Sequence, residues 1–279
     1  MSLTLMYITN NQDVAVIAEK SGVQRIWIDL ETLGKEERQR NMNTVKSHHT
    51  IEDVKNIAGI LTSSEILVRI NPWNENSVQE INNVINAGAK IIMLPMWKTV
   101  REVKNFITAV DKRAKTILLL ETKEGVECLD DILRLRGINE IHIGLNDLHL
   151  SYKLAFMFEL LANGTVERIC RKIAAKGLPY GFGGIARLGA GMIPAEMIIM
   201  EHYRLGSTRA ILSRSFCDYG EIKDLGKVNK IFQKNIKSLR SYEVSVMKAD
   251  EAALTDNRER LKMAVEEAVQ KLEGHIMER

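Results

Sequence analysis

Short runs of strand-forming apolar residues recur along the whole chain, and most show little alternation between apolar and polar positions. Runs that are apolar on both faces are typical of parallel strands with helices covering both sides of the sheet. Such runs occupy residues 3–9, 25–31, 66–71, 90–95, 116–122, 140–147, 179–185 and 208–216.

Segments with helical spacing of apolar residues lie between these runs, and glycines follow several of them, as is typical of helix ends. The helical segments are 13–21, 51–61, 77–87, 100–110, 125–135, 165–175 and 194–203, and the glycines are Gly22, Gly88, Gly137, Gly177 and Gly206. This alternation predicts an α/β fold, the (β/α)8 or TIM barrel with additional C-terminal helices. The 279 residues suit one such barrel, which typically needs roughly 250 residues. A doubly wound open sheet is the main alternative.

Residues 1–220 form the predicted barrel domain, and residues 221–279 add C-terminal helices that we assign to the same domain. The last predicted helix spans residues 256–277 and carries an apolar stripe. The stripe consists of Leu261, Val265, Ala268, Leu272 and Ile276. Such a stripe must be buried, either against the chain's own barrel or against a partner subunit. We expect a homo-oligomer in which the C-terminal helices contact the partner.

Acidic residues stand where several predicted strands end, which is where α/β barrels carry out their chemistry. Glu121 ends the fifth run and Asp147 ends the sixth. Asp29 and Glu31 end the second run, and Arg69 lies near the end of the third. Carboxylates held close together cannot all stay ionised without a cation, and hard oxygen ligands suit Mg2+ or Mn2+, with other divalent ions possible. Alternatively, Asp29, Glu31 and Arg69 form a structural ion-pair network.

An arginine beside a divalent ion could hold a 2-oxo acid, because the guanidinium fork of Arg69 matches a carboxylate. The cation and the guanidinium would both stabilise an enolate oxygen as it forms. The strand interiors contain no lysine placed for Schiff-base chemistry, and the sequence lacks a Walker loop, a G-x-G-x-x-G motif and a G-x-S-x-G elbow.

Composition and charge narrow the expected partners and location. The net charge of +3 gives no reason to expect nucleic acid or a membrane as a partner. No apolar run approaches the ~20 residues of a membrane span, and the first residues lack the features of a secretory signal. Cys128, Cys170 and Cys217 match neither a disulfide framework nor a zinc motif. We therefore expect a cytoplasmic protein with reduced thiols.

Five segments, in this order and about one strand–helix unit apart, resemble the HpcH/HpaI aldolase and citrate lyase β-subunit superfamily. They are Ile28-Asp29-Leu30-Glu31, Leu67-Val68-Arg69-Ile70-Asn71-Pro72, Gly88-Ala89-Lys90-Ile91-Ile92-Met93-Leu94-Pro95, Leu120-Glu121-Thr122-Lys123-Glu124-Gly125-Val126 and Ile143-Gly144-Leu145-Asn146-Asp147-Leu148. The resemblance spans residues 20–216 and implies a phosphoenolpyruvate/pyruvate-type barrel.

The resemblance also implies roles for individual residues. Glu121 and Asp147 would bind Mg2+ or a similar ion, and Arg69 would contact the carboxylate and the enolate oxygen of the substrate. Asp29 and Glu31 would contact metal-bound waters or support the residues around the metal. The implied reaction is a reversible carbon–carbon cleavage through an enolate of pyruvate or of an acyl-CoA.

Two positions depart from the family pattern. Thr32 stands where the pyruvate aldolases have a histidine and the citrate-lyase-like proteins have an aspartate. Leu119 stands where the aldolases often have a glutamine, so one pocket wall is more apolar. The alternatives to an aldolase are therefore a CoA-ester lyase and a barrel that serves as a binding or assembly protein.

Two histidines could replace the missing base. His48 and His49 lie in the long segment after the second run, just before a helix that Thr50 and Asp53 would cap. They could instead be solvated loop residues. We place Gly144, Leu119 and Asn146 with Arg69 among the substrate contacts. The glycine-rich segment 181–191 could cradle a phosphate, or could simply be a tightly packed turn.

Overall fold

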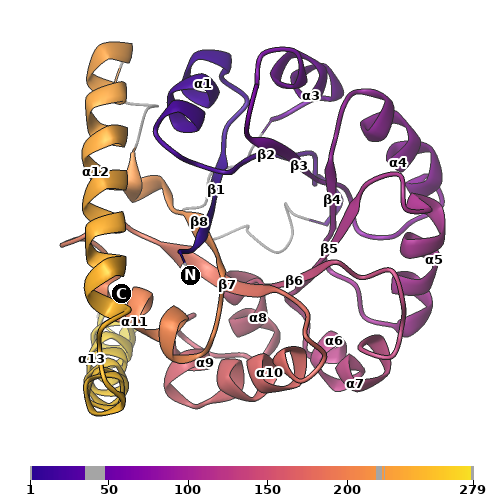
Figure 1. The fold of residues 1–279 in the computed structure, drawn as a ribbon. Coiled ribbons are helices and arrows are strands. Elements are labelled where there is room, and N and C mark those ends of the chain that lie inside the picture. The colour runs from indigo at the N-terminus through magenta and orange to yellow at the C-terminus, as the bar shows by residue number, and fades with distance from the viewer. Residues whose placement is uncertain (1, 35–47, 218–221, 223, 278–279) are drawn as a thin grey trace.

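A computed structural model describes residues 2–34, 48–217, 222 and 224–277. Eight parallel strands form a closed barrel in sequence order, with β8 pairing back onto β1 (Figure 1). The strands are β1 (Thr4–Ile8), β2 (Arg25–Asp29), β3 (Glu65–Arg69), β4 (Ile91–Leu94), β5 (Lys115–Leu120), β6 (Glu140–Ile143), β7 (Tyr180–Ile185) and β8 (Arg209–Leu212). The predicted (β/α)8 barrel is confirmed, and the open sheet is excluded because the first and last strands are hydrogen-bonded.

Helices surround the barrel on all sides (Figure 1). They are α1 (Gln12–Lys20), α3 (Ile51–Ala58), α4 (Ser77–Asn86), α5 (Val100–Val110), α6 (Lys123–Glu127), α7 (Leu129–Ile132), α8 (Leu145–Ser151), α9 (Glu159–Ala162), α10 (Thr165–Ala174), α11 (Ala195–Arg204), α12 (Leu225–Val246) and α13 (Glu251–Met277). Two predictions were wrong. The helix expected over 125–135 is broken into α6 and α7, and the sixth strand ends at Ile143, so Asp147 lies in the first turn of α8.

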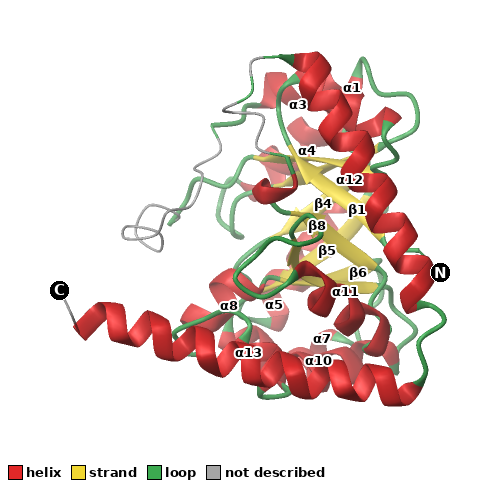
Figure 2. Ribbon diagram, turned by 90° about the vertical axis from the view of Figure 1, so that its left-hand side faces the viewer, coloured by secondary structure: helices red, strands yellow, loops and turns green. Residues whose placement is uncertain are grey.

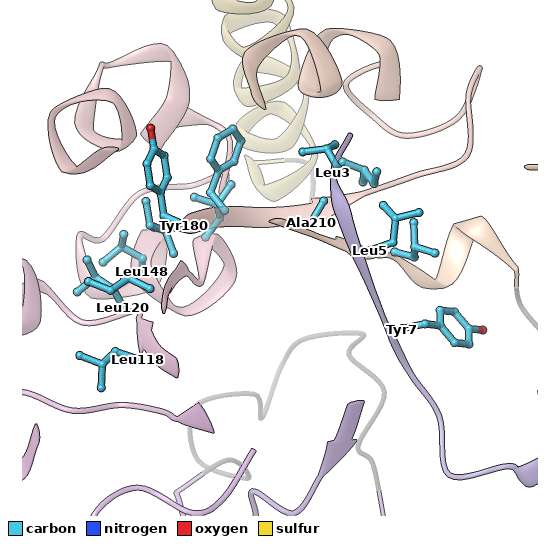
Figure 3. Packing of buried hydrophobic residues seen from close by; sticks show 14 of the residues in the cluster. Leu3, Leu5, Tyr7, Leu118, Leu120, Leu148, Tyr180 and Ala210 are labelled. Carbon is cyan, nitrogen blue, oxygen red and sulfur yellow. The ribbon is translucent and has the colours of Figure 1, made fainter. Parts of the chain in front are cut away.

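Two apolar layers explain why the strands lack polar alternation. One layer fills the barrel interior and consists of Met6, Trp27, Leu67, Ile91, Met93, Ile117 and Leu119. The other lies between the strands and the helices and includes the residues of Figure 3, among them Leu5, Leu118, Leu120 and Tyr180. Because both faces of each strand are covered, both must be apolar.

An ion-pair network closes the end of the barrel where the strands begin. Arg25 donates to both carboxylate oxygens of Glu140, at 2.7 and 2.5 Å, and Arg209 donates to one of them at 2.8 Å. Burial raises the pKa of Glu140, but Arg25 and Arg209 outweigh this effect and hold the pKa below its usual value. The predicted site residues lie at the opposite end, where the strands finish and where α/β barrels carry out their chemistry.

The last two helices lie along one side of the barrel, with α12 against α1 and α13 against α9 and α11 (Figures 1 and 2). Leu261, Val265 and Ala268 are buried within the chain's own fold, so this part of the stripe needs no partner subunit. Leu272 is half-buried, and the side chain of Ile276 lies outside the described residues. The homo-oligomer stays a prediction. None of the helices in the described residues is long and apolar enough to cross a membrane.

Candidate active site

The strand ends bring the predicted acidic residues and Arg69 together at one mouth of the barrel. Asp29 ends β2, Arg69 ends β3, and Glu121 directly follows β5. Asp147 is not on a strand, but it lies in the first turn of α8 and lines the same pocket as Glu121. The residues predicted from the sequence therefore lie at one mouth of the barrel, although Asp147 belongs to a helix and not to a strand.

Arg69 is held between two carboxylates. Its Nε and Nη2 each donate to Asp29 at 2.8 Å, and its Nη1 lies 3.2 Å from Glu31. The guanidinium also stacks over Trp27, 5.3 Å from the ring centroid. Burial lowers the pKa of Arg69, but the charges of Asp29 and Glu31 reverse this effect and raise it above its usual value. The ion-pair network that we considered exists, and it keeps the guanidinium charged and fixed in orientation.

Glu121 is buried and tightly placed. Its Oε1 accepts the backbone N–H of Met96 at 3.0 Å, and Met96 has a φ of 53°, a left-handed conformation that is uncommon for a residue other than glycine. A Cβ added at Gly144 would lie 2.8 Å from Oε2 of Glu121, so the absence of a side chain there makes room for the carboxylate. Burial raises the pKa of Glu121 well above its usual value, and the neighbouring charge of Asp147 raises it further.

Glu121 and Asp147 open into a pocket of about 340 Å³. Its other lining residues are Met96, Lys98, Thr122, Glu124, Leu150 and Ser151. Among the described residues, no group of three His, Cys, Asp or Glu side chains could hold a metal alone. Mg2+ usually keeps several waters and takes only one or two protein carboxylates, so these two residues fit a cation that shares its coordination with a substrate.

The three predicted substrate contacts lie near this pocket in different ways. Gly144 lies beside Glu121, where any added side chain would collide with the carboxylate. Leu119 is buried in the barrel interior, two residues before Glu121, and belongs to the apolar layer under the site. Asn146 lies half-buried in the first turn of α8, next to Asp147. Their contact with a substrate stays a prediction.

His49 is anchored to the end of β2. Its Nδ1 accepts the backbone N–H of Asp29 at 3.0 Å. Because a backbone N–H can only donate, Nδ1 carries no proton and the neutral ring carries its proton on Nε2. A ring in this tautomer offers a donor rather than a base. His48 is exposed, and Thr50 and Asp53 form the predicted capping box of α3.

The segment around Thr32 has a structural role that the sequence did not reveal. Oδ1 of Asn71 accepts the backbone N–H and the hydroxyl of Thr32, at 2.9 and 3.2 Å, and the backbone N–H of Leu33 at 3.0 Å. Asn71 in turn donates to Glu80 on α4 at 2.9 Å. These residues help to line a second pocket of about 530 Å³, which lies between the segments that follow β2 and β3 and the helix α4.

In the glycine-rich segment after β7, a backbone N–H that could have bound a phosphate has a hydrogen-bond partner within the chain. The backbone N–H of Gly189 donates to the carboxylate of Glu196 at 2.8 Å, so this N–H already has an acidic partner within the chain. Arg187 is exposed. The tightly packed turn that we considered is therefore the better description.

The chain is similar to known proteins in sequence and in fold. A family model described as HpcH/HpaI aldolase/citrate lyase matches residues 3–158. The HpcH/HpaI aldolase from Desulfitobacterium hafniense DCB-2 is similar in structure, with a TM-score of 0.60 and 14% identity over 86% of this chain and 93% of that one. Citrate synthase SbnG gives a TM-score of 0.58 and 17% identity over 86% of this chain and 94% of that one.

A third similar structure is an HpcH/HpaI aldolase/citrate lyase family protein from Burkholderia cenocepacia J2315. It gives a TM-score of 0.59 and 14% identity over 81% of this chain and 95% of that one. At such low identities, these three structures establish the shared fold only. A search of curated proteins gives no match.

Proposed function

The chain belongs to the HpcH/HpaI aldolase/citrate lyase family, and from that premise we propose that it is a divalent-metal-dependent carbon–carbon lyase acting on a 2-oxo acid. Membership itself implies an enzyme of the aldolase or lyase type with a small-molecule substrate. The finer proposal is that the reaction passes through an enolate of a pyruvate-derived substrate. It depends on one observation: a carboxylate pair, the buried Glu121 and the half-buried Asp147, that opens into one pocket, with Glu121 within the electrostatic reach of Arg69.

The substrate would be held by charge and by geometry. Arg69 would bind the substrate's carboxylate and the oxygen that becomes negative, because Asp29 and Glu31 fix the orientation of its guanidinium. When bound by Glu121 and Asp147, Mg2+ or Mn2+ supplies Lewis-acid stabilisation of developing negative charge on the substrate. Leu119 would keep water away from the underside of the substrate.

His49 would assist as a proton donor. Its Nε2–H, fixed by the bond from Asp29 to Nδ1, could donate to an oxygen of the substrate or of the leaving aldehyde. A His49→Gln variant retains an amide donor, whereas His49→Ala removes it. We expect a larger loss of turnover in the alanine variant than in the glutamine variant.

Oxaloacetate tests the enolate chemistry, because its decarboxylation passes through the pyruvate enolate. We expect turnover that requires Mg2+ or Mn2+ and that falls at least about a hundredfold in Arg69→Ala and Glu121→Gln, as when one preorganised charge contact is removed. Glu124→Gln is the matched control, since Glu124 lines the same pocket but is half-exposed and pairs with Lys98 at 3.6 Å. Metal-independent turnover, or equal losses in the control, would refute the proposal.

Two other functions remain as outcomes of this test. A CoA-ester lyase needs basic residues to hold the nucleotide, and among the described residues lining the pocket only Lys98 is basic. Metal binding without turnover on any 2-oxo acid or CoA ester would favour a binding or assembly protein. A cytoplasmic location and a homo-oligomer complete the proposal, and the three cysteines are free thiols in the structure.

A further inference from the structure

The pocket beside Thr32 and Asn71 lies outside the candidate active site and is here called the amide pocket. Its volume of about 530 Å³ exceeds the 340 Å³ of the pocket that contains Glu121 and Asp147, and the two pockets share no lining residue. The segments after β2 and β3 form it together with α3 and α4, which are neighbours on the barrel surface (Figure 1). One side of the pocket is apolar, and the other carries the side-chain amides that give it its name.

The apolar side comes from the segment after β2 and from the start of α3. Leu30 is half-buried, but Leu33 is 50% exposed and Ile51 is 42% exposed. Both exposed side chains line the pocket, so their apolar surface is in water where a ligand could cover it. Covering apolar surface is favourable, and this side therefore favours a ligand with an apolar face.

The other side carries five amides from the segment after β3 and from α4. They belong to Asn71, Asn74, Asn76, Gln79 and Asn83. Internal hydrogen bonds order several of them. Nδ2 of Asn74 donates to the carbonyl of Pro72 at 2.8 Å, and Nε2 of Gln79 donates to Oδ1 of Asn83 at 2.8 Å. Because these side chains are already ordered, a ligand that binds them loses less free energy to their immobilisation.

The polar groups of α4 offer acceptors and donors side by side. Within the described residues, the bond between Gln79 and Asn83 leaves Oε1 of Gln79 as an acceptor and Nδ2 of Asn83 as a donor. Oε1 of Glu80 accepts the side-chain amide of Asn71 at 2.9 Å, whereas Oε2 accepts only the backbone N–H of Asn71, at 3.3 Å. Hydroxyl groups suit such a surface, because each hydroxyl can both donate and accept.

The composition of the lining argues against other classes of ligand. None of the described lining residues is a lysine, arginine or histidine, so a phosphate or carboxylate group would find no counter-charge. None of them is aromatic, so a nucleobase would find no ring to stack on. Glu80 is the one carboxylate among them, which is too few for a cation site. The barrel is closed and offers an extended peptide no strand edge.

We propose that the amide pocket binds a neutral polyhydroxylated ligand, a sugar or sugar alcohol. Its hydroxyl groups would bond to Gln79, Asn83 and Glu80, and its C–H groups would cover Leu33 and Ile51. A sugar combines the two properties that the pocket requires, since its hydroxyls lie along an edge and its C–H groups form an apolar face. The site is separate from the candidate active site and does not depend on the proposed lyase activity.

Saturation-transfer difference NMR on the full chain tests the proposal, with glucose, galactose, mannose, maltose and sorbitol as probes. We expect binding of at least one probe, with an affinity that does not change as ionic strength rises, because the ligand is uncharged. The double variant Gln79→Met, Asn83→Leu removes the paired amides and keeps residues that favour helix. Since one hydrogen bond contributes about fivefold to affinity, the loss of two should weaken binding about thirtyfold. The melting temperature should stay near that of the parent.

The matched control makes the same two changes at exposed amides that do not line the pocket. It is Gln270→Met, Asn86→Leu, and Asn86 lies on α4 as Asn83 does. This control and Glu121→Gln should both keep the affinity of the parent. The proposal is overturned if none of the probes binds, or if the control loses as much affinity as the pocket variant. It is also overturned if Glu121→Gln abolishes binding, which would put the sugar in the candidate active site, or if adenosine or phosphate binds the pocket and the sugars do not.

Discussion

Divalent-metal binding by Glu121 and Asp147 should appear as thermal stabilisation, and its size can be worked out in advance. A cation at a hundred times its dissociation constant stabilises the folded state by about 2.7 kcal/mol. Because 1 kcal/mol shifts the melting temperature of a protein of this size by about 2 °C, Mg2+ or Mn2+ should raise the melting temperature by about 5 °C. Differential scanning fluorimetry at increasing metal concentration measures the shift.

Glu121→Gln keeps the shape of the side chain and removes its charge, so the metal-induced shift should disappear. The metal-free variant should be at least as stable as the parent. Burial and Asp147 raise the pKa of Glu121, so ionising this carboxyl group costs folding free energy, and the metal-free parent loses stability as pH rises through that pKa. Glu124→Gln should keep the full shift. An unresponsive parent, or the same shift in Glu121→Gln, would refute the site.

Three further predictions follow from individual contacts. Gly144→Ala would put a methyl group 2.8 Å from Oε2 of Glu121. The variant should lose the metal-induced thermal shift, and urea unfolding should show a loss of about 1–3 kcal/mol in stability. An intact thermal shift would show that the close approach does not matter for metal binding. Glu140→Gln leaves Arg25 buried without its carboxylate partner and should cost about 3 kcal/mol at neutral pH without changing oxaloacetate turnover. Because the pKa of Glu140 is lowered, its contribution is present above the ordinary carboxyl pKa and is lost as pH falls, so parent and variant should converge in acid; a constant difference would contradict this. Burial lowers the pKa of His142 to about 4, so its neutral ring stabilises the fold above pH 6.5 and that contribution declines toward pH 4; an NMR titration midpoint near 6.5 would contradict the burial.

Most of the barrel was predictable because apolar runs report burial directly. The pattern located all eight strands, and it located the ends of α1, α4 and α10 by the glycines that follow them. Those glycines have the positive φ values typical of helix ends. The errors fall where one apolar run serves two elements. Residues 140–147 read as a single strand, but the chain turns at Gly144 and continues as α8, and a short apolar run cannot distinguish these alternatives.

The candidate site was predictable in its side chains but not in its backbone contacts. Carboxylates at strand ends identify Glu121 and Asp29, because barrels place strand ends at one mouth. The amide of Met96 on Glu121 and the amide of Asp29 on His49 depend on backbone direction, which residue types do not encode. For that reason the sequence suggested His49 as a base, whereas in the structure its Nδ1 already accepts the backbone N–H of Asp29.

The bonds that converge on Asn71 tie the turn after β2 to helix α4 through Glu80. Position 32 is thereby coupled to two partners that are remote in sequence. Replacing Thr32 with the histidine that the family pattern would lead one to expect would remove the hydroxyl bond to Asn71 while leaving Asn71 and Glu80 unchanged. An engineer who wants to install that histidine should vary all three positions in one library, since testing them singly would hide any combination that works.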